Sequence, residues 1–431
     1  MNKDKIFLCC DRVILTSLCL LIFCLPFSKA GAESFTLLAF VFWVLKRIFG
    51  YRSESLWGVL PKTGLNIVLG IYILVNAVAV IYSVNFGMSL RAFFGKELKF
   101  LAIYFMLVEV INSKKRLKII LSAIIVSATF IIIDAGVMYF KGVDFLRGHE
   151  LGLYPLCASF TTSSGFAAWL TVIIPVFIGI IAAKIFPDLR LKILLSTAVI
   201  IQSLYLIETY SRGGWLGLLV GILFIIYFVL KNSTSMIRNS CVIAVLSILC
   251  ISLLLPKSVV VNIKYYIWTN FKVSQSINAR LKSAQQLNGD RSTFIRFMLW
   301  KESLRIIRDY PLTGCGLNTY SVVAKKYKSF ELGGIYPHNS YLQKAAETGV
   351  FGLIAFLLFL FSFFCKGVRY FNQRKDYLVL GFLSAILAFL VHAFFDTHLY
   401  SLQLVVLFWY LLGLTMAVIK LGNNSYRNPG G

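Results

Sequence analysis

Apolar segments long enough to cross a membrane recur along nearly the whole of this 431-residue chain. A helix needs about 20 mostly apolar residues to cross the hydrocarbon core of a bilayer. Hydrophobic residues make up 58% of the sequence and charged residues only 14%, which excludes a soluble globular domain. We therefore predict an all-α polytopic membrane protein. It has about twelve transmembrane helices, of which the fourth is short, at 12–28, 34–50, 64–83, 98–112, 117–140, 164–186, 191–209, 213–230, 239–256, 345–365, 377–395 and 400–420.

Basic residues in the short connections predict the orientation of these spans. If the N-terminus is cytoplasmic, the basic clusters all fall on the cytoplasmic side, as the positive-inside rule requires. They lie at 46–62, 114–118, 190–192, 231–238 and 366–375. The first segment ends in Ala30-Gly31-Ala32, which is typical of a cleavable signal peptide. We favour a retained first helix over cleavage within residues 1–32, because the orientation of the next span then follows from its own basic end.

One long polar segment interrupts the apolar pattern and divides the chain into three regions. Residues 1–255 hold the first nine helices, residues 256–344 form a large basic loop, and residues 345–431 hold the last three helices and a cytoplasmic tail. Residues 256–342 contain 13 Lys and Arg but only four Asp and Glu. The segment exceeds the length of about 60 residues within which loop charge controls topology, so its charge needs another cause. We expect it outside the cytoplasm, where it binds anionic headgroups or an anionic substrate. Arg291–Tyr310 is expected to form a helix that ends at Pro311, with a second helix from about Asn318.

His338 lies at the mouth of the tenth span. It follows Pro337, and Asn339 or Ser340 is suited to cap the helix that comes next. A helix N-terminus favours the neutral imidazole, which can act as a base. Residues 340, 343 and 347 add a polar stripe that leads into the span. The alternative is a hydrogen-bonded interfacial histidine with no chemical role.

Arg212 lies at the outer end of the eighth span, beside Gly213 and Gly214. Exposed amides at a helix N-terminus and a neighbouring guanidinium together suit a phosphate. The alternative for Arg212 is an ordinary interfacial side chain. For Gly217 and Gly221 the favoured interpretation is close helix packing.

Other patterns point less directly to chemistry. His392, Asp396 and His398 form H-x3-D-x-H, which we interpret as a hydrogen-bonded structural cluster rather than a metal site. Most of the nine cysteines resemble small apolar residues, and a disulfide between Cys157 and Cys315 is a minor alternative. No dinucleotide or phosphate-loop glycine pattern occurs, so no nucleotide cofactor and no nucleic-acid partner are expected.

Three motifs resemble one known family. SRGGWLGL (211–218) and PHNSYLQKAAETGVFGL (337–353) resemble the paired signatures of the O-antigen ligase and O-antigen polymerase superfamily. Arg296-x3-Trp300, followed by YPLTGCGLNTY (310–320), resembles the outer-loop helix and turn of that family. The stretch SFTTSSGFAAW (159–169) lacks the Asn that members often carry there, so it receives no role.

The resemblance implies a glycosyltransferase of the bacterial inner membrane whose active site faces the periplasm. Its substrates would be a glycan on undecaprenyl diphosphate and, for a ligase, the lipid A–core acceptor, within a membrane-lipid environment. By resemblance, Arg212 and Arg296, with Arg291, hold the diphosphate, and His338 acts on the acceptor hydroxyl with inversion. Supporting residues are Asn339, Tyr341, Gln343, Glu347 and Lys96. A ligase is favoured over a polymerase that joins lipid-linked repeat units, and a transporter or flippase of a lipid-linked anion is the more distant alternative.

Overall fold

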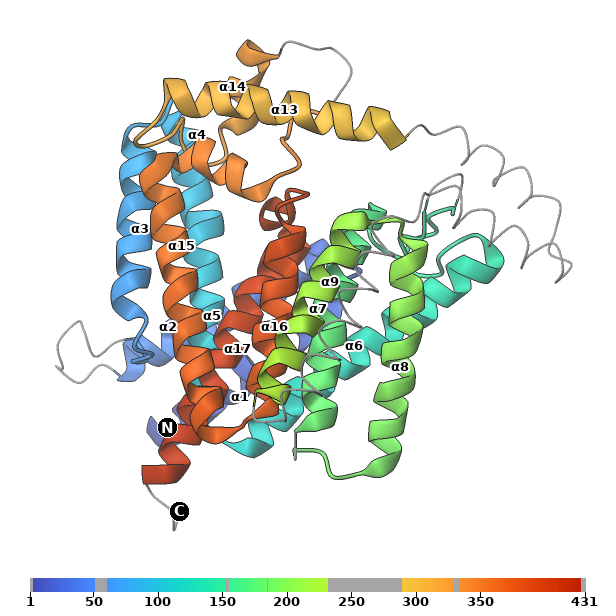
Figure 1. The fold of residues 1–431 in the computed structure, drawn as a ribbon. Helices are drawn as coiled ribbons and strands as arrows, with labels where there is room; N and C mark the ends of the chain where they lie inside the picture. Colours follow the sequence, from blue (N-terminus) through green and yellow to red (C-terminus); the bar gives the residue numbers. More distant parts are fainter. Residues whose placement is uncertain are drawn as a thin grey trace, which may run out of the picture.

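The computed structural model describes residues 3–50, 60–151, 155–183, 185–231, 289–328 and 334–427 (Figure 1). Over these residues the chain is helical, and its only β-pairing is an isolated bridge between Val143 and Glu150. The all-α class is therefore confirmed. The elements are α1 (Lys3–Cys24), α2 (Lys29–Gly50), α3 (Asn66–Ile81), α4 (Phe86–Ala92), the π-helix η2 (Phe93–Leu98), α5 (Lys99–Val110), α6 (Lys114–Lys141), α7 (Ser163–Ala182), α8 (Leu189–Glu208), α9 (Arg212–Leu230), α13 (Gly289–Asp309), α14 (Tyr320–Tyr327), α15 (Ser340–Arg374), α16 (Tyr377–His392), the 3-10 turn η3 (His398–Tyr400) and α17 (Leu402–Arg427).

Seven helices of the described residues are long and apolar enough to cross a membrane. They are α1, α6, α7, α8, α9, α15 and α17, and α3 and α16 are shorter apolar helices. A multi-pass membrane protein follows from this set. The count of twelve remains a prediction, because the expected span 239–256 and residues 256–288 of the predicted loop lie outside the described residues.

Two expected spans have a different form in the structure. The expected span 98–112 is the 12-residue α5, which continues directly from α4 and the π-helix η2. The expected span 345–365 is part of the 35-residue α15, which is interrupted at Gly349 with φ 67° and ψ −176°. An added Cβ at Gly349 would lie 2.0 Å from the carbonyl oxygen of Leu312, so only glycine fits this break.

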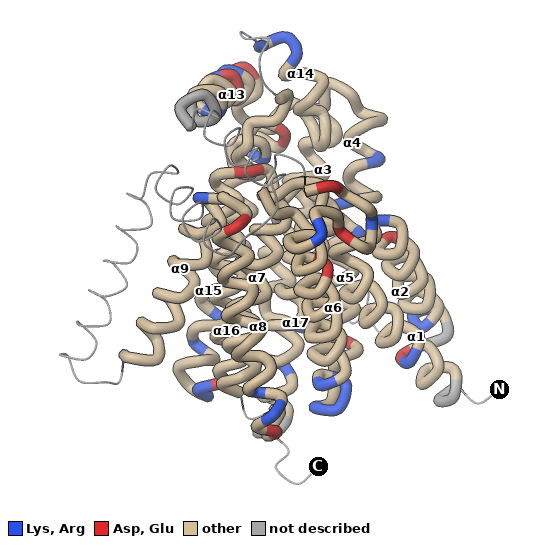
Figure 2. The backbone as a smooth tube through the Cα atoms, turned by 90° about the vertical axis from the view of Figure 1, so that its right-hand side faces the viewer, with Lys and Arg blue, Asp and Glu red and all other residues tan. Residues whose placement is uncertain are grey.

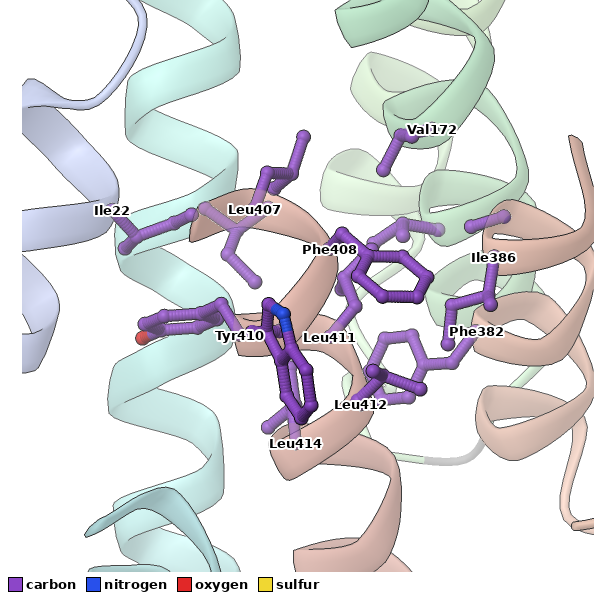
Figure 3. Packing of buried hydrophobic residues seen from close by; sticks show 14 of the residues in the cluster. Ile22, Val172, Phe382, Ile386, Leu407, Phe408, Tyr410, Leu411, Leu412 and Leu414 are labelled. Carbon is purple, nitrogen blue, oxygen red and sulfur yellow. The ribbon is translucent and has the colours of Figure 1, made fainter. Parts of the chain in front are cut away.

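The central helix of the bundle is α17, and nearly all of its side chains are buried (Figure 3). Phe408 stacks on Phe389 of α16 with ring centroids 5.4 Å apart, and Trp409 stacks on Phe359 of α15 at 5.6 Å. Tyr410 donates a hydrogen bond to the carbonyl oxygen of Leu18, which ties α17 to α1. The C-terminal helix therefore connects both halves of the bundle.

Small residues set how closely α16 approaches its neighbours. A Cβ at Gly217 of α9 would lie 2.5 Å from the carbonyl oxygen of Ala388, and one at Gly179 of α7 would lie 2.9 Å from the Cα of Gly381. Ser384 also donates a hydrogen bond to the carbonyl oxygen of Gly221 at 2.7 Å. The packing interpretation of Gly217 and Gly221 is confirmed.

One end of the bundle is covered by α13 and α14, whereas the two termini lie at the opposite end (Figure 1). The expected helices at Arg291–Tyr310 and after Asn318 are thus found as α13 and α14. Charged residues lie mostly near the two ends of the bundle and are sparse between them (Figure 2). We call the end that carries α13 the capped end.

Candidate active site

His338 lies at the capped end, immediately before α15. Its φ of 47° places it in the left-handed region, which non-glycine residues rarely adopt. Asn339 is the N-cap of α15, and its Oδ1 accepts hydrogen bonds from the backbone N–H groups of Tyr341 and Leu342 at 2.9 and 3.0 Å. The cap and the left-handed turn together fix the direction of the imidazole. Strained residues of this kind are concentrated at functional sites.

The imidazole of His338 is held by a carboxylate from a distant part of the sequence. Its Nδ1 lies 2.9 Å from Oδ1 of Asp396, in the connection between α16 and α17. A carboxylate accepts only, so Nδ1 carries the proton and Nε2 is left with a lone pair. The side chain of His338 remains 40% exposed, which leaves Nε2 accessible.

Asp396 is itself fixed by several donors. Ser164, at the start of α7, donates to its Oδ2 at 2.5 Å, and the backbone N–H of Thr397 donates to its Oδ1 at 2.8 Å. Burial opposes ionisation of this carboxyl, but the hydrogen bonds from His338 and Ser164 and the nearby His398 outweigh it and keep the pKa of Asp396 below its usual range. Asp396 is therefore an anion that orients His338.

Ser340 connects the same turn to the end of α16. Its backbone N–H donates to the carbonyl oxygen of Ala393 at 2.9 Å, and its hydroxyl donates to the carbonyl oxygen of Asp396 at 2.9 Å. Tyr341 donates its hydroxyl proton to the carbonyl oxygen of Leu390 at 2.8 Å. The start of α15 and the connection 393–401 are thus joined by backbone contacts, so the positions of His338 and Asp396 depend on each other.

His392 and His398 lie in the protein interior beside this pair. Their rings are 4.2 Å apart in an edge-to-face arrangement. The Nδ1 of His392 and the Nε2 of His398 are buried without a hydrogen-bond partner, and Nε2 of His392 lies 3.1 Å from the hydroxyl oxygen of Ser211. Over the described residues, no three His, Cys, Asp or Glu side chains are grouped in a way that suits a metal ion.

Arg212 is brought to the same cluster by the start of α9. Ser211 caps this helix through the N–H of Gly214 and contacts His392, whereas the exposed Arg212 has no ion-pair partner among the described residues. An added Cβ at Gly213 would lie 2.9 Å from both His392 and Phe395. Gly213 is therefore packed closely against the end of α16.

Arg296 reaches the cluster from α13. Burial lowers the pKa of His398 to about 4, the carboxylate of Asp396 opposes this shift, and the guanidinium charge of Arg296 adds to it, so Arg296 lies within electrostatic range of His398. Four residues further on, Trp300 contacts Phe394 edge-to-face with ring centroids 5.6 Å apart, which docks α13 on the connection after α16. Arg291 lies in the same helix, but its side chain lies outside the described residues.

Three of the expected supporting residues form a separate group. Gln343 donates to Oε1 of the buried Glu347 at 3.3 Å, and the backbone N–H of Asn318 donates to Oε2 of Glu347 at 2.9 Å. Lys96 binds Oδ1 of Asn318 at 2.6 Å. Lys96 and Glu347 line a cavity that His338 does not line. Asn339 and Tyr341 remain with His338, whereas Lys96 and Glu347 line that cavity and Gln343 contacts it through Glu347. Cys157 and Cys315 are both free thiols.

Comparison with known proteins assigns this region to a family. Residues 197–357, which include Arg212, Arg296 and His338, match the family described as O-antigen ligase. The match supports the O-antigen ligase and O-antigen polymerase superfamily, whose members are transferase-like membrane proteins.

A curated protein also matches part of this chain. An uncharacterized protein of Haemophilus influenzae is 25% identical over 188 residues, which is 41% of this chain and 44% of that protein. The match thus covers less than half the length of this relative.

Sequence reasoning missed Asp396, which holds His338, and Ser164, which holds Asp396. Asp396 had been placed in a structural H-x3-D-x-H cluster, and Ser164 had received no role. Both lie outside the segment 197–357 that matches the family. The available signal was topological: Ser164 and Asp396 lie at the ends of expected spans that emerge on the same side as His338.

Proposed function

We propose that this protein transfers a glycan from undecaprenyl diphosphate to a sugar hydroxyl of lipid A–core, as an inverting O-antigen ligase at the periplasmic face of the bacterial inner membrane. The observation that carries the proposal is the contact between His338 and Asp396 in a chain whose family match spans His338, Arg212 and Arg296.

The proposed chemistry uses the free lone pair of His338. With Nδ1–H donated to Asp396, Nε2 takes the proton of the acceptor hydroxyl as its oxygen bonds to the anomeric carbon of the donor sugar. The bond between the anomeric carbon and the diphosphate oxygen breaks at the same time, and its electrons leave with the diphosphate. The ionised Asp396 stabilises the imidazolium that results.

The leaving diphosphate needs positive charge where it departs. Arg212 and Arg296 project from α9 and α13, two helices that meet at the histidine cluster. A guanidinium offers two parallel donors to a phosphate and is always charged. Arg212 has no carboxylate partner among the described residues, so its charge is available to a ligand. Arg291 is proposed to assist from α13.

Complementation of a bacterial strain that lacks its O-antigen ligase tests this proposal. Wild type, His338→Ala and Arg212→Ala are expressed at matched membrane levels. Lipopolysaccharide is then read on gels, and undecaprenyl-linked glycan is measured after extraction. His149→Ala and Arg308→Ala are matched controls, because each removes the same side-chain type from the capped end outside the His338 cluster.

We expect wild type and both controls to restore the lipopolysaccharide ladder, and His338→Ala and Arg212→Ala to leave glycan on the carrier lipid. Normal ladders from His338→Ala would refute the assignment of the base. If wild type fails in the ligase strain but restores chain extension in a strain that lacks its polymerase, the acceptor is another lipid-linked repeat unit and the ligase assignment is wrong.

A further inference from the structure

A second polar site lies at the capped end, on the other side of the connection between α16 and α17. It is a cavity of about 730 Å³, enclosed by α3, α4, η2, α5, α15 and α17. Neither His338, Arg212 nor Arg296 lines it. Leu399 and Tyr400 do line it, and the N–H of Leu399 donates to the hydroxyl of Ser340 at 3.3 Å. The cavity and the His338 cluster are therefore neighbours that share one wall.

The mouth of the cavity is basic. Arg91 and Lys96 line it and are exposed, and Lys96 Nζ lies 2.6 Å from Oδ1 of Asn318, a neutral partner. Arg91 has no ion-pair partner among the described residues. By contrast, Lys99 is paired with Glu33 at 2.7 Å. Two cations at the rim are thus available to an anionic group.

Deeper in the cavity, the charges are balanced. Lys344 is buried and its Nζ lies 2.7 Å from the hydroxyl of Tyr72 and 3.1 Å from Oε1 of Glu97. Tyr72 in turn donates to Oε2 of Glu97 at 2.6 Å. Ionisable side chains within membrane-spanning helices are costly and mark functional sites. This paired group can exchange hydrogen bonds with hydroxyls but offers no net charge.

The floor of the cavity is apolar. Phe356, Leu402, Val405 and Trp409 line it, and their helices α15 and α17 continue into the bundle. The lining therefore changes from cationic through neutral polar to aromatic and aliphatic. An amphiphile with an anionic head and a hydrocarbon chain has the same order of groups.

The rim is built by an unusual helix. Gly95, Lys96 and Glu97 all belong to the π-helix η2, a geometry that is rare and occurs frequently at functional sites. The widened turn places Lys96 at the mouth and Glu97 beside Lys344. Gly95 lines the cavity, and an added Cβ there would meet no atom within 4 Å.

We propose that this cavity binds a phosphate-bearing amphiphile, with its phosphate at Arg91 and Lys96 and its chain on the floor formed by Phe356 and Trp409. The site is separate from the His338 cluster. The role of this site in the reaction rests on the proposed function, because a transfer between two lipids needs a binding site for each lipid.

The test fills the cavity without disturbing its walls. Gly95→Trp places a large side chain in open space, and Arg91→Gln with Lys96→Gln removes the rim charge. Gly70→Trp is the matched control, because Gly70 also has no atom within 4 Å of an added Cβ but does not line the cavity. Purified variants with melting temperatures equal to wild type are titrated with monophosphoryl lipid A, phosphatidylglycerol or farnesyl diphosphate, and binding is measured by native mass spectrometry.

We expect Gly95→Trp and the double variant to weaken binding of monophosphoryl lipid A, phosphatidylglycerol or both by at least about tenfold, since two charge-assisted contacts or the binding volume are lost. Gly70→Trp should bind as wild type does. Loss confined to monophosphoryl lipid A would identify a glycolipid head, and loss confined to phosphatidylglycerol would identify a membrane phospholipid. Loss confined to farnesyl diphosphate would identify a polyprenyl diphosphate, and unchanged binding of all three lipids by the filled cavity would overturn the proposal. Because binding is read without turnover, His338→Ala, which should bind monophosphoryl lipid A and phosphatidylglycerol normally, separates this result from failure of the proposed transfer reaction.

Discussion

The two ends of the helical bundle hold their charges in opposite ways. At the end near the termini, Asp11 and Glu109 are surrounded by cations. Lys46 lies 2.6 Å from Asp11 and 2.7 Å from Glu109, Arg116 lies 2.9 Å from Asp11, and Arg47 pairs with Glu109. Trp43 adds a hydrogen bond to Glu109 at 2.9 Å. Asp11 and Glu109 are therefore each paired with cationic side chains from other helices.

At the capped end, not every charged or ionisable side chain is paired. Asp396 is fully hydrogen-bonded, but its partner His338 keeps one ring nitrogen accessible, and Arg212 and Arg91 have no ion-pair partner among the described residues. Charged side chains that are paired contribute to stability, whereas accessible charged side chains are able to bind a ligand or take part in a reaction. Substitutions at the two ends should therefore separate folding from function.

The largest expected effect is on turnover, from Asp396→Asn. Loss of the anion removes the stabilisation of the imidazolium and allows the wrong tautomer, so transfer should slow by about 10²–10⁴-fold. Donor affinity should stay unchanged, and so should the melting temperature to within a few degrees. Transfer assays with purified protein and binding assays with the lipid diphosphate measure the two quantities.

The matched control is Asp144→Asn, which alters another buried carboxylate that binds backbone N–H groups, those of Arg147 and His149. This variant should lose stability while each folded molecule keeps normal turnover. Equal loss of turnover in both variants would mean that Asp396 acts only on folding.

At the opposite end, Glu109→Gln should lower stability by about 1–3 kcal/mol, a value between those for exposed and buried ion pairs. It leaves Lys46 and Arg47 without one of their counterions. Turnover per folded molecule should be normal. Thermal unfolding in detergent measures the change in stability. The control is Glu33→Gln, which alters a half-exposed acid paired with Lys99 alone and should lower stability by less than about 1 kcal/mol. A fall in turnover without a fall in stability would contradict the division between the two ends.

The pH dependence of stability should also arise at the capped end. Burial lowers the pKa of His398 to about 4, from an unfolded value near 6.5. Between these values the unfolded chain binds a proton that the folded chain does not, so stability should fall as pH falls from 6.5 to 4. The loss at pH 5 should be about 1–2 kcal/mol.

His398→Phe tests this cause, because it keeps an aromatic ring beside His392 and Phe389 and removes a buried nitrogen that lacks a partner. Its melting temperature should vary less with pH than that of wild type across this range. An identical pH profile would assign the effect to other groups.

The smallest expected effect comes from Ser164→Ala. It removes one of the hydrogen bonds to Asp396 and leaves those from His338 and Thr397. Turnover should fall by about tenfold, the equivalent of one hydrogen bond to a charged group. The same transfer assay measures it, and a fall as large as that of Asp396→Asn would show that Ser164 has a role of its own.

The sequence alone was sufficient for the helical class and for several local features. Apolar length predicts a helix because a backbone in lipid must satisfy its own hydrogen bonds, and the regular elements of the described residues are all helices. Capping by Asn339 and the end of α13 before Pro311 depend on residues close in sequence. Short-range stereochemistry controls such features, so the sequence carries them directly. The family motifs likewise located His338, Arg212 and Arg296 within the segment that matches the family.

Tertiary structure decided which of these residues act together. Asp396 is 58 positions from His338 and Ser164 is 232 positions from Asp396, and no periodicity links residues so far apart. The π-helix η2, the break at Gly349 and the cavity that divides Lys96 and Glu347 from His338 also depend on how α3, α15 and α17 pack. The sequence by itself determined the segments that cross the membrane and the residue types available at their ends, because hydropathy and capping are local properties. Only the packing of the helices determined which carboxylate meets the histidine and which cations remain accessible, because these depend on distances between helices.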